Sequence, residues 1–128
     1  MKFVIIGGGP AGVQAATHGA RLGADVTLIE KDVLGGAANL WDCVPSKAMI
    51  ATGAVVKMLE RAERIGLPSH RISPDLNELR KRVKSITDKL AKSYDQLLGS
   101  QGVRVIKGTG RIASKHEVVA TFLDGTEE

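Results

Sequence analysis

The sequence predicts an α/β fold in which helices cover a parallel β-sheet. Residues 3–6 form a short apolar run of β-forming residues that ends in Gly7-Gly8-Gly9, and residues 25–30 form a second such run. Between them, residues 10–22 are alanine-rich and begin with a proline, as a helix does. Strand, helix and strand fit into about thirty residues, the size of a βαβ unit. We therefore expect two parallel strands joined by a right-handed crossover.

The composition fits one ordinary globular domain. Of the 128 residues, 43% are hydrophobic and 25% charged, so neither disorder nor a fibrous repeat is indicated. Aromatic residues make up 3%, which argues against nucleic-acid binding that relies on base stacking. The single cysteine, Cys43, excludes an internal disulfide and is compatible with a reducing cytosol. No long apolar run or signal peptide is evident, so we expect a cytoplasmic protein without a membrane span.

A pair of long helices is expected after the second strand. The first runs from about residue 45 to 64, after a loop through Gly35-Gly36, and a linker at residues 69–74 leads to the second, residues 75–101. Apolar residues recur at helical spacing in the second helix. The short linker predicts antiparallel helices that bury a shared apolar seam. We interpret the basic residues from Arg80 to Lys84 as a solvated helix face.

Shorter strands are expected near the end of the chain. Residues 103–106 are a candidate third strand of the parallel sheet, which Gly108 and Gly110 are expected to break. Residues 111–123 predict weaker strands leading into Asp124-Gly125, a hairpin-turn pair. Only three residues follow this pair. We expect residues 1–128 to be the N-terminal part of a larger, incomplete domain that ends at the start of a β-meander.

Gly7, Gly9 and Gly12 form the pattern G-x-G-x-x-G between the first strand and the first helix. In a Rossmann-type fold the first glycine allows a tight turn, the second lets the backbone approach a pyrophosphate, and the third permits close packing of helix on strand. The backbone N–H groups at the helix start and the helix dipole are expected to stabilise phosphate charge; Pro10, which has no N–H, and Ala11 lie in this first turn. The pattern predicts a dinucleotide site.

Glu30 strengthens this prediction. It ends the second strand, eighteen residues after Gly12, where a carboxylate accepts hydrogen bonds from ribose hydroxyls. An acid at this place disfavours a 2′-phosphate. The ligand expected from these residues is FAD or NAD, and the glycine pattern does not choose between them.

The segment from Gly35 to Lys47 favours FAD. Its sequence, G-G-A-A-N-L-W-D-C-V-P-S-K, resembles the redox segment of the flavoprotein disulfide reductases, which reads G-G-T-C-x-x-x-x-C-V-P-S-K. The resemblance implies a Rossmann-type FAD-binding domain with a long helix pair, and NADH or NADPH as the hydride donor. It also implies that Lys47 points toward the flavin, that residues 108–110 lie beside the adenine, and that the parent protein is a homodimer.

The glycine pattern and the resemblance together give a set of expected cofactor contacts. These are Gly7, Gly9, Pro10, Ala11, Gly12, Glu30, Lys31, Gly36, Ala37, Lys47, Thr109 and Gly110. The candidate catalytic residues are Lys47 and Cys43. Cys43 matches the family's second redox cysteine; it could rest as a thiolate or be an inert, small buried residue, and the inert interpretation is favoured.

The segment also departs from the family. Ala38 stands where the family has its first redox cysteine, and Ala37 where it has a threonine that assists FAD binding. Thiol–disulfide exchange needs both sulfurs, so reduction of disulfides by the family's route is not expected. The altered segment, with Trp41-Asp42, resembles that of actinobacterial lipoamide-dehydrogenase-like quinone reductases. This resemblance implies that a quinone or similar small acceptor takes electrons directly from the flavin.

Two alternatives stay open. The chain could belong to a dihydrolipoamide dehydrogenase-like disulfide reductase whose first cysteine was changed to Ala38. It could also be a non-catalytic dinucleotide-binding module that assembles with a partner. His18, His70 and His116 lack the spacing of a metal site or a catalytic triad, so no metal is expected.

Overall fold

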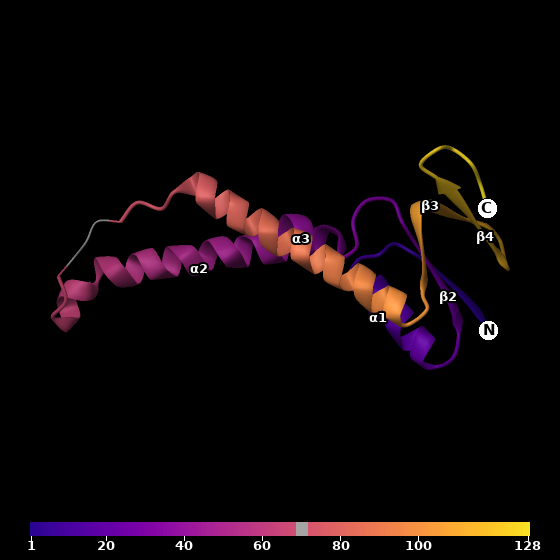
Figure 1. Ribbon diagram of the computed structural model, residues 1–128, viewed down its shortest axis with the longest axis horizontal. Coiled ribbons are helices and arrows are strands. Elements are labelled where there is room, and N and C mark those ends of the chain that lie inside the picture. Colours follow the sequence, from indigo (N-terminus) through magenta and orange to yellow (C-terminus); the bar gives the residue numbers. More distant parts are fainter. Residues whose placement is uncertain (69–71) are drawn as a thin grey trace.

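The computed structural model describes residues 1–68 and 72–128 as a small α/β body from which two long helices extend (Figure 1). Strand β1 (Lys2–Ile6), helix α1 (Pro10–Arg21) and strand β2 (Asp25–Glu30) form the expected βαβ unit. β1 and β2 pair in parallel. Strand β3 (Arg104–Ser114) continues the sheet beside β2, also in parallel, and strand β4 (Glu117–Phe122) follows in antiparallel pairing. The predicted α/β class and parallel sheet are confirmed.

The core has two parts, one on each face of the sheet. On the first face, α1 and the C-terminal end of the long helix α3 (Leu76–Ser100) pack on β2; Val13, Leu28 and Leu98 are fully buried there. On the second face, Ile29 and Ile106 pack beneath Ala120 of β4. Because successive side chains of a strand point to opposite faces, β2 contributes to both parts.

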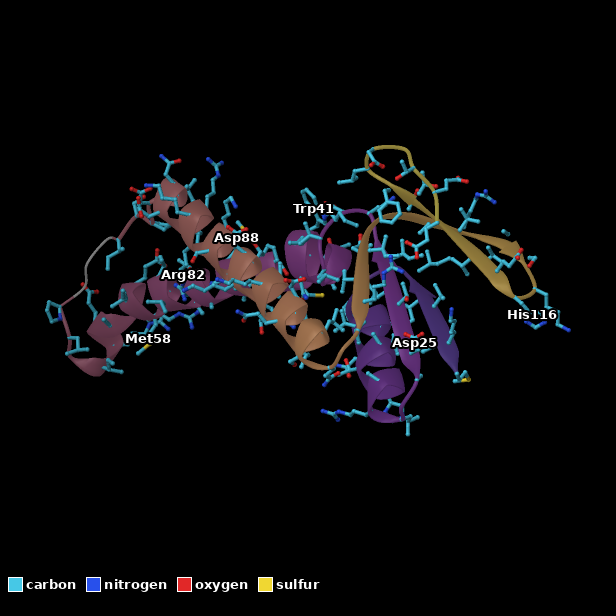
Figure 2. All side chains as sticks on the ribbon, turned by 45° about the vertical axis from the view of Figure 1, so that its right-hand side comes forward. Asp25, Trp41, Met58, Arg82, Asp88 and His116 are labelled. Carbon is cyan, nitrogen blue, oxygen red and sulfur yellow. The ribbon has the colours of Figure 1, made fainter. Side chains whose placement is uncertain are left out.

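Helix α2 (Cys43–Glu60) runs outward from the sheet and α3 returns antiparallel to it, as expected (Figure 1). A short 3-10 helix, η2 (Ala62–Ile65), follows α2. Figure 2 shows Met58 on the outer part of this helix pair, away from the strand that carries Asp25. The linker predicted at residues 69–74 lies partly outside the described residues, and His70 lies entirely outside them.

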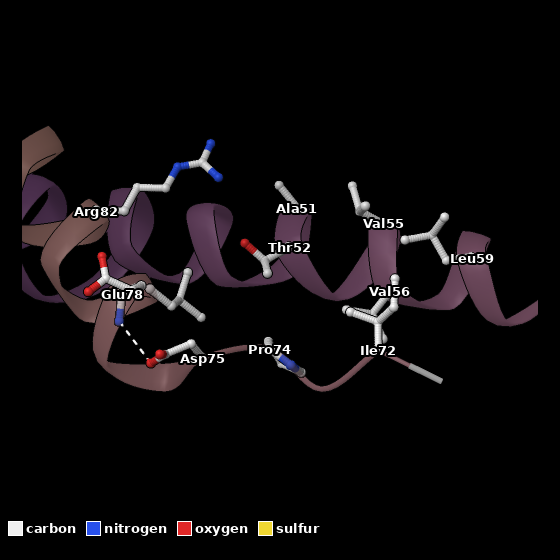
Figure 3. A pocket seen from close by; sticks show the side chains of 11 residues that line it. Ala51, Thr52, Val55, Val56, Leu59, Ile72, Pro74, Asp75, Glu78 and Arg82 are labelled. Atoms are coloured by element: carbon white, nitrogen blue, oxygen red, sulfur yellow. Dashed lines mark hydrogen bonds between the residues drawn. The ribbon is translucent and has the colours of Figure 1, made fainter. Parts of the chain in front are cut away.

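The predicted shared seam of the helix pair is only partly closed. No side chain of α2 is buried, and α3 buries only Thr87 and Leu98. Within the part of the chain that the structure describes, cavities remain between the helices, and one of them is drawn in Figure 3. The helical spacing of apolar residues correctly predicted α3, but it could not tell how closely α2 would approach. The carboxylate of Asp75 caps α3 by accepting hydrogen bonds from the Asn77 and Glu78 amides at 2.8 and 3.1 Å (Figure 3 shows the second).

The start of α2 differs from the prediction. Residues 38–42, expected in a loop, form a π-helical turn, η1 (Ala38–Asp42), and α2 begins at Cys43 rather than near Pro45. The Cys43 amide closes this turn by donating to the Ala38 carbonyl. A proline is tolerated in the first turn of a helix, so Pro45 does not mark where the helix begins.

The predicted break in the third strand was wrong. β3 continues through Gly108 and Gly110, which face Phe122 and Ala120 of β4. A Cβ at position 108 would collide with the Thr121 carbonyl oxygen, so glycine is needed here for the close approach of β4. The glycines thus mark the place where β3 exchanges its partner β2 for β4.

The end of the chain begins a β-meander. The Thr126 amide donates to the Asp124 carboxylate at 3.0 Å in the expected turn. Beyond it, the amides of Ala120 and Glu128 each donate to the other residue's carbonyl, at 2.8 and 2.9 Å. Among the described residues, no helix combines the length and apolar character that crossing a membrane requires.

Candidate functional site

The glycine loop leaves the carboxyl end of β1 and turns directly into α1. Gly7 has a φ of +101°, and its amide donates to the Ile29 carbonyl at 2.8 Å, which ties the loop to β2. The first intrahelical bond runs from the Val13 amide to the Gly9 carbonyl. The amides of Ala11 and Gly12 precede that bond and have no partner within the helix. They are placed to hold an anionic group at the positive end of the helix dipole.

Two glycines of the pattern differ in what surrounds them. A Cβ on Gly12 would overlap the Gly7 carbonyl oxygen, so only glycine lets α1 approach the loop this closely. A Cβ on Gly9 would meet no atom within 4 Å. The space in front of Gly9 is therefore open to a ligand.

Glu30 is held beside the glycine loop by two backbone amides. Gly8 donates to Oε2 at 2.6 Å, and Asp32 donates to Oε1 at 2.7 Å. A carboxylate has about four acceptor positions, so Glu30 retains capacity for hydroxyl donors. Gly8 was missed by the sequence reasoning. The available sign was the glycine at position 8, in the middle of the run Gly7-Gly8-Gly9. The structure shows why it is needed, because a Cβ on Gly8 would lie 2.8 Å from Leu34 Cδ2.

A cavity of about 320 Å³ opens at the carboxyl ends of the three parallel strands. Its size lies at the lower end of the range typical of small-molecule sites. The structure brings five of the expected contacts together around it, and apolar side chains complete the wall. Its lining consists of Ile6, Gly7, Ile29, Glu30, Lys31, Gly108, Thr109 and Gly110.

A second glycine turn packs on the first. The Gly35 amide donates to the Gly8 carbonyl at 2.8 Å. Gly36 has a φ of +57°, and a Cβ on it would lie 3.0 Å from Gly9 Cα. These contacts bring Gly36 and the adjoining Ala37 to the start of α1, although both residues lie far from α1 in the sequence.

Positions 38 and 43 face the same side of the π-helical turn. In such a turn the hydrogen bond spans five residues, and here it joins the Cys43 amide to the Ala38 carbonyl. Cys43 is exposed, so the interpretation of this residue as a small buried side chain was wrong. Lys47 lies one turn further along α2 and is also exposed. Neither residue lines the cavity beside Glu30.

The remaining polar candidates lie outside this site. His18 is on the exposed face of α1, and His116 lies in the turn between β3 and β4. Within residues 1–68 and 72–128, no group of His, Cys, Asp or Glu side chains is arranged to hold a metal ion. The basic residues between positions 80 and 84 are exposed, as expected of a solvated helix face. Two of them pair with acids on α3: Lys81 with Glu78, and Lys84 with Asp88, each at 2.7 Å.

Residues 1–128 match the family described as pyridine nucleotide-disulphide oxidoreductase. The chain belongs to this family. The likeness covers the glycine loop, the helix pair and the third strand, and the chain matches a fragment of a Rossmann-type FAD-binding domain. The resemblance of residues 35–47 to the flavoprotein disulfide reductases is confirmed.

Relatives in this family are longer than the chain. A dihydrolipoyl dehydrogenase of Zymomonas mobilis is 31% identical over 126 residues, which are 98% of this chain and 27% of the relative. A dihydrolipoyl dehydrogenase of Bacillus subtilis is 32% identical over 99% of this chain and 28% of its own length. The crystal structure of LpdA from Mycobacterium tuberculosis superposes with a TM-score of 0.87 at 37% identity, over all of this chain and 29% of LpdA. The chain thus spans less than a third of each.

Proposed function

We propose that this chain is the FAD-binding part of an NAD(P)H-dependent flavoprotein oxidoreductase. The observation that carries the proposal is the juxtaposition of Glu30 and the glycine loop at one cavity, joined by the 2.6 Å hydrogen bond from Gly8. The free amides at the start of α1 suit a pyrophosphate, and the carboxylate of Glu30 suits ribose hydroxyls. These features fit the adenosine half of FAD.

The cavity beside Glu30 has an apolar wall at Gly110. Gly110 leaves a flat surface over the apolar side chains of Ile6 and Ile29, since a Cβ on it would lie 3.0 Å from Ile6 Cγ1. Such a surface suits an adenine ring. Pyrophosphate would lie against Gly9 and the amide of Ala11, and the flavin would extend toward the segment that carries Lys47. When bound, FAD would supply two-electron chemistry between a reduced nicotinamide and an acceptor.

We infer that the acceptor takes electrons without an intervening disulfide, as a quinone does. The chain has one cysteine, and Ala38 shares a face of the π-helical turn with it. Exchange with a disulfide substrate requires a second sulfur at that place. The residues therefore favour a small acceptor that reacts with the flavin itself.

A second candidate is dihydrolipoyl dehydrogenase activity. The relatives from Zymomonas mobilis and Bacillus subtilis are dihydrolipoyl dehydrogenases, and neither is named a quinone reductase. Their names support this alternative more directly than they support a quinone acceptor. It requires that the natural protein carry cysteine where Ala38 now stands.

FAD titration of the purified chain tests the proposed site. We expect saturable quenching of flavin fluorescence. Glu30→Gln should weaken FAD binding about tenfold or more, because the side-chain NH₂ of glutamine cannot accept the hydrogen bond that a backbone N–H donates to the carboxylate of Glu30. Asp25→Asn is a matched control, since it removes a carboxylate at the opposite end of the same strand. Equal losses in the two variants, or no saturable binding by the unchanged chain, would refute the proposal.

A further inference from the structure

A second, larger cavity opens between the π-helical turn and the first half of α3. Its volume is about 540 Å³. Leu40 and Trp41 contribute to it from the turn, Met49 from α2, and Leu79, Arg80 and Val83 from α3. The cavity shares no residue with the one beside Glu30. It is large enough for a bicyclic molecule.

Trp41 gives this cavity its chemical character. It is the only tryptophan of the chain, and the residue is 72% exposed. Figure 2 shows it on the outside of the fold, where the helix pair meets the sheet. An indole ring beside aliphatic side chains offers both apolar area and a π-face, so a planar aromatic ligand would be stabilised by stacking as well as by burial.

The charge of the rim is positive. Arg80 and Lys84 both line the cavity. Lys84 is paired with Asp88, whereas Arg80 forms no salt bridge among the residues that the structure describes. The nearest acid before it on α3, Glu78, is already paired with Lys81. The Arg80 guanidinium is therefore available to an anionic oxygen, which it can bind through two N–H donors.

The position of the cavity relates it to electron transfer. Leu40 and Trp41 lie in the same π-helical turn as Ala38, the residue that replaces the family's first redox cysteine. A ligand stacked on Trp41 would lie next to the start of α2, the helix that carries Lys47 and toward which the flavin extends in the function proposed above. We propose that this cavity binds a planar aromatic electron acceptor that carries a negative charge, such as an anionic quinone. The acceptor role rests on the function proposed above, whereas the binding itself does not.

The other cavity of the helix pair lacks these features. It measures about 450 Å³ and lies between α2 and the start of α3 (Figure 3). Its walls are aliphatic, with Val55, Val56 and Leu59 from α2, and it contains no aromatic residue. Its two carboxylates are already engaged, because Asp75 caps α3 and Glu78 pairs with Lys81. Arg82 lines this cavity and not the one beside Trp41, which makes it a useful control.

Quenching of tryptophan fluorescence tests the proposal directly, because all of this signal comes from Trp41. The probes are 2-hydroxy-3-methyl-1,4-naphthoquinone, an anion at neutral pH, and the uncharged 2,3-dimethyl-1,4-naphthoquinone. Both ring positions beside the carbonyls are substituted, so that neither probe adds to the Cys43 thiol. We expect saturable quenching by both probes, with tighter binding of the anion.

Arg80→Gln should weaken binding of the anionic probe roughly five- to tenfold and leave the neutral probe unchanged, as expected for one charge-assisted contact. Arg82→Gln removes the same charge from the same helix and should change neither affinity. An absence of saturable quenching, or equal losses in the two variants, would overturn the proposed cavity. This titration contains no FAD. Saturable quenching would therefore support the cavity even in a chain that fails to bind FAD, and that failure would refute only the flavoprotein function.

Discussion

The Gly35 amide donates to the Gly8 carbonyl at 2.8 Å, and this bond fastens the second glycine turn to the first. Residues from two separate segments thereby form one surface at the start of α1. Gly36 packs tightly on this surface, because a Cβ on it would lie 3.0 Å from Gly9 Cα, closer than an ordinary van der Waals contact. The two turns should therefore act together in cofactor binding.

The first prediction concerns this contact. In Gly36→Ala the new methyl group would push Gly9 away by a few tenths of an ångström, and we expect FAD binding to weaken about tenfold or more. Gly66→Ala is the control, because Gly66 also has a positive φ of +81° but a Cβ there meets nothing within 4 Å. Both variants should lose roughly 1–2 kcal/mol of stability to backbone strain. Flavin titration should separate them, and unchanged FAD affinity in Gly36→Ala would contradict the role given to this turn.

The second prediction compares two helical glycines. Gly12→Ala places a methyl group on the Gly7 carbonyl oxygen, so we expect a loss of roughly 1–3 kcal/mol in the free energy of unfolding. Gly53 lies in α2, where an added methyl group would meet no atom within 4 Å, and Gly53→Ala should stabilise the chain by about 0.5–1 kcal/mol. Urea denaturation measures both changes. Equal effects of the two substitutions would show that the close approach at Gly12 is not maintained in solution.

Much of the site was predictable from sequence because its residues follow local rules. The glycine pattern correctly predicted the strand, turn and helix of residues 2–21, and Glu30 ended its strand where expected. These features depend on backbone conformation within a few residues. The family resemblance placed Thr109 and Gly110 at the cofactor, and in the structure both residues line the same cavity as Glu30.

Other features depend on contacts between distant segments. The sequence interpretation took Gly108 for a strand break, because a glycine that admits a neighbouring strand has the same appearance as one that ends a strand. No amino-acid pattern predicts the π-helical turn at residues 38–42. The gap between α2 and α3 depends on how the two helices lie relative to each other. Trp41 was noticed as a departure from the family, but its place in a cavity required the structure.

The third prediction uses the shared face of the π-helical turn. Ala38→Cys should form a disulfide with Cys43 on mild oxidation, because the hydrogen bond between these two positions places them one above the other. Ala37→Cys offers a thiol one residue earlier, on a different side, and should remain reduced under the same conditions. Titration of free thiols should give none for the oxidised Ala38→Cys chain and two for Ala37→Cys. Two free thiols in both variants would contradict the geometry of the turn.

The fourth prediction concerns acid sensitivity of the β-meander. Arg104 binds the Glu128 carboxylate through two N–H donors, one of them at 2.6 Å from Oε2. Hydrogen bonding from Arg104 and, to a lesser extent, its positive charge lower the pKa of Glu128 below the ordinary value of 4.5. The hydroxyl and amide of Thr126 likewise lower the pKa of Asp124 below 3.8.

A carboxylate with a lowered pKa in the folded state stabilises the fold above its unfolded-state pKa, and this contribution is lost as the pH falls through the lower, folded value. The thermal midpoint should therefore fall as the pH drops below about 4.5, and the contribution of Glu128 should begin to be lost at a higher pH than that of Asp124. Glu128→Gln should lower the thermal midpoint at neutral pH. It should also make the midpoint depend less on pH just below pH 4.5, where Glu128 begins to take up a proton. Glu60→Gln, at the exposed end of α2, is the control and should leave the profile unchanged. An identical acid profile in Glu128→Gln and the unchanged chain would show that the pair with Arg104 does not hold the last residues against β4.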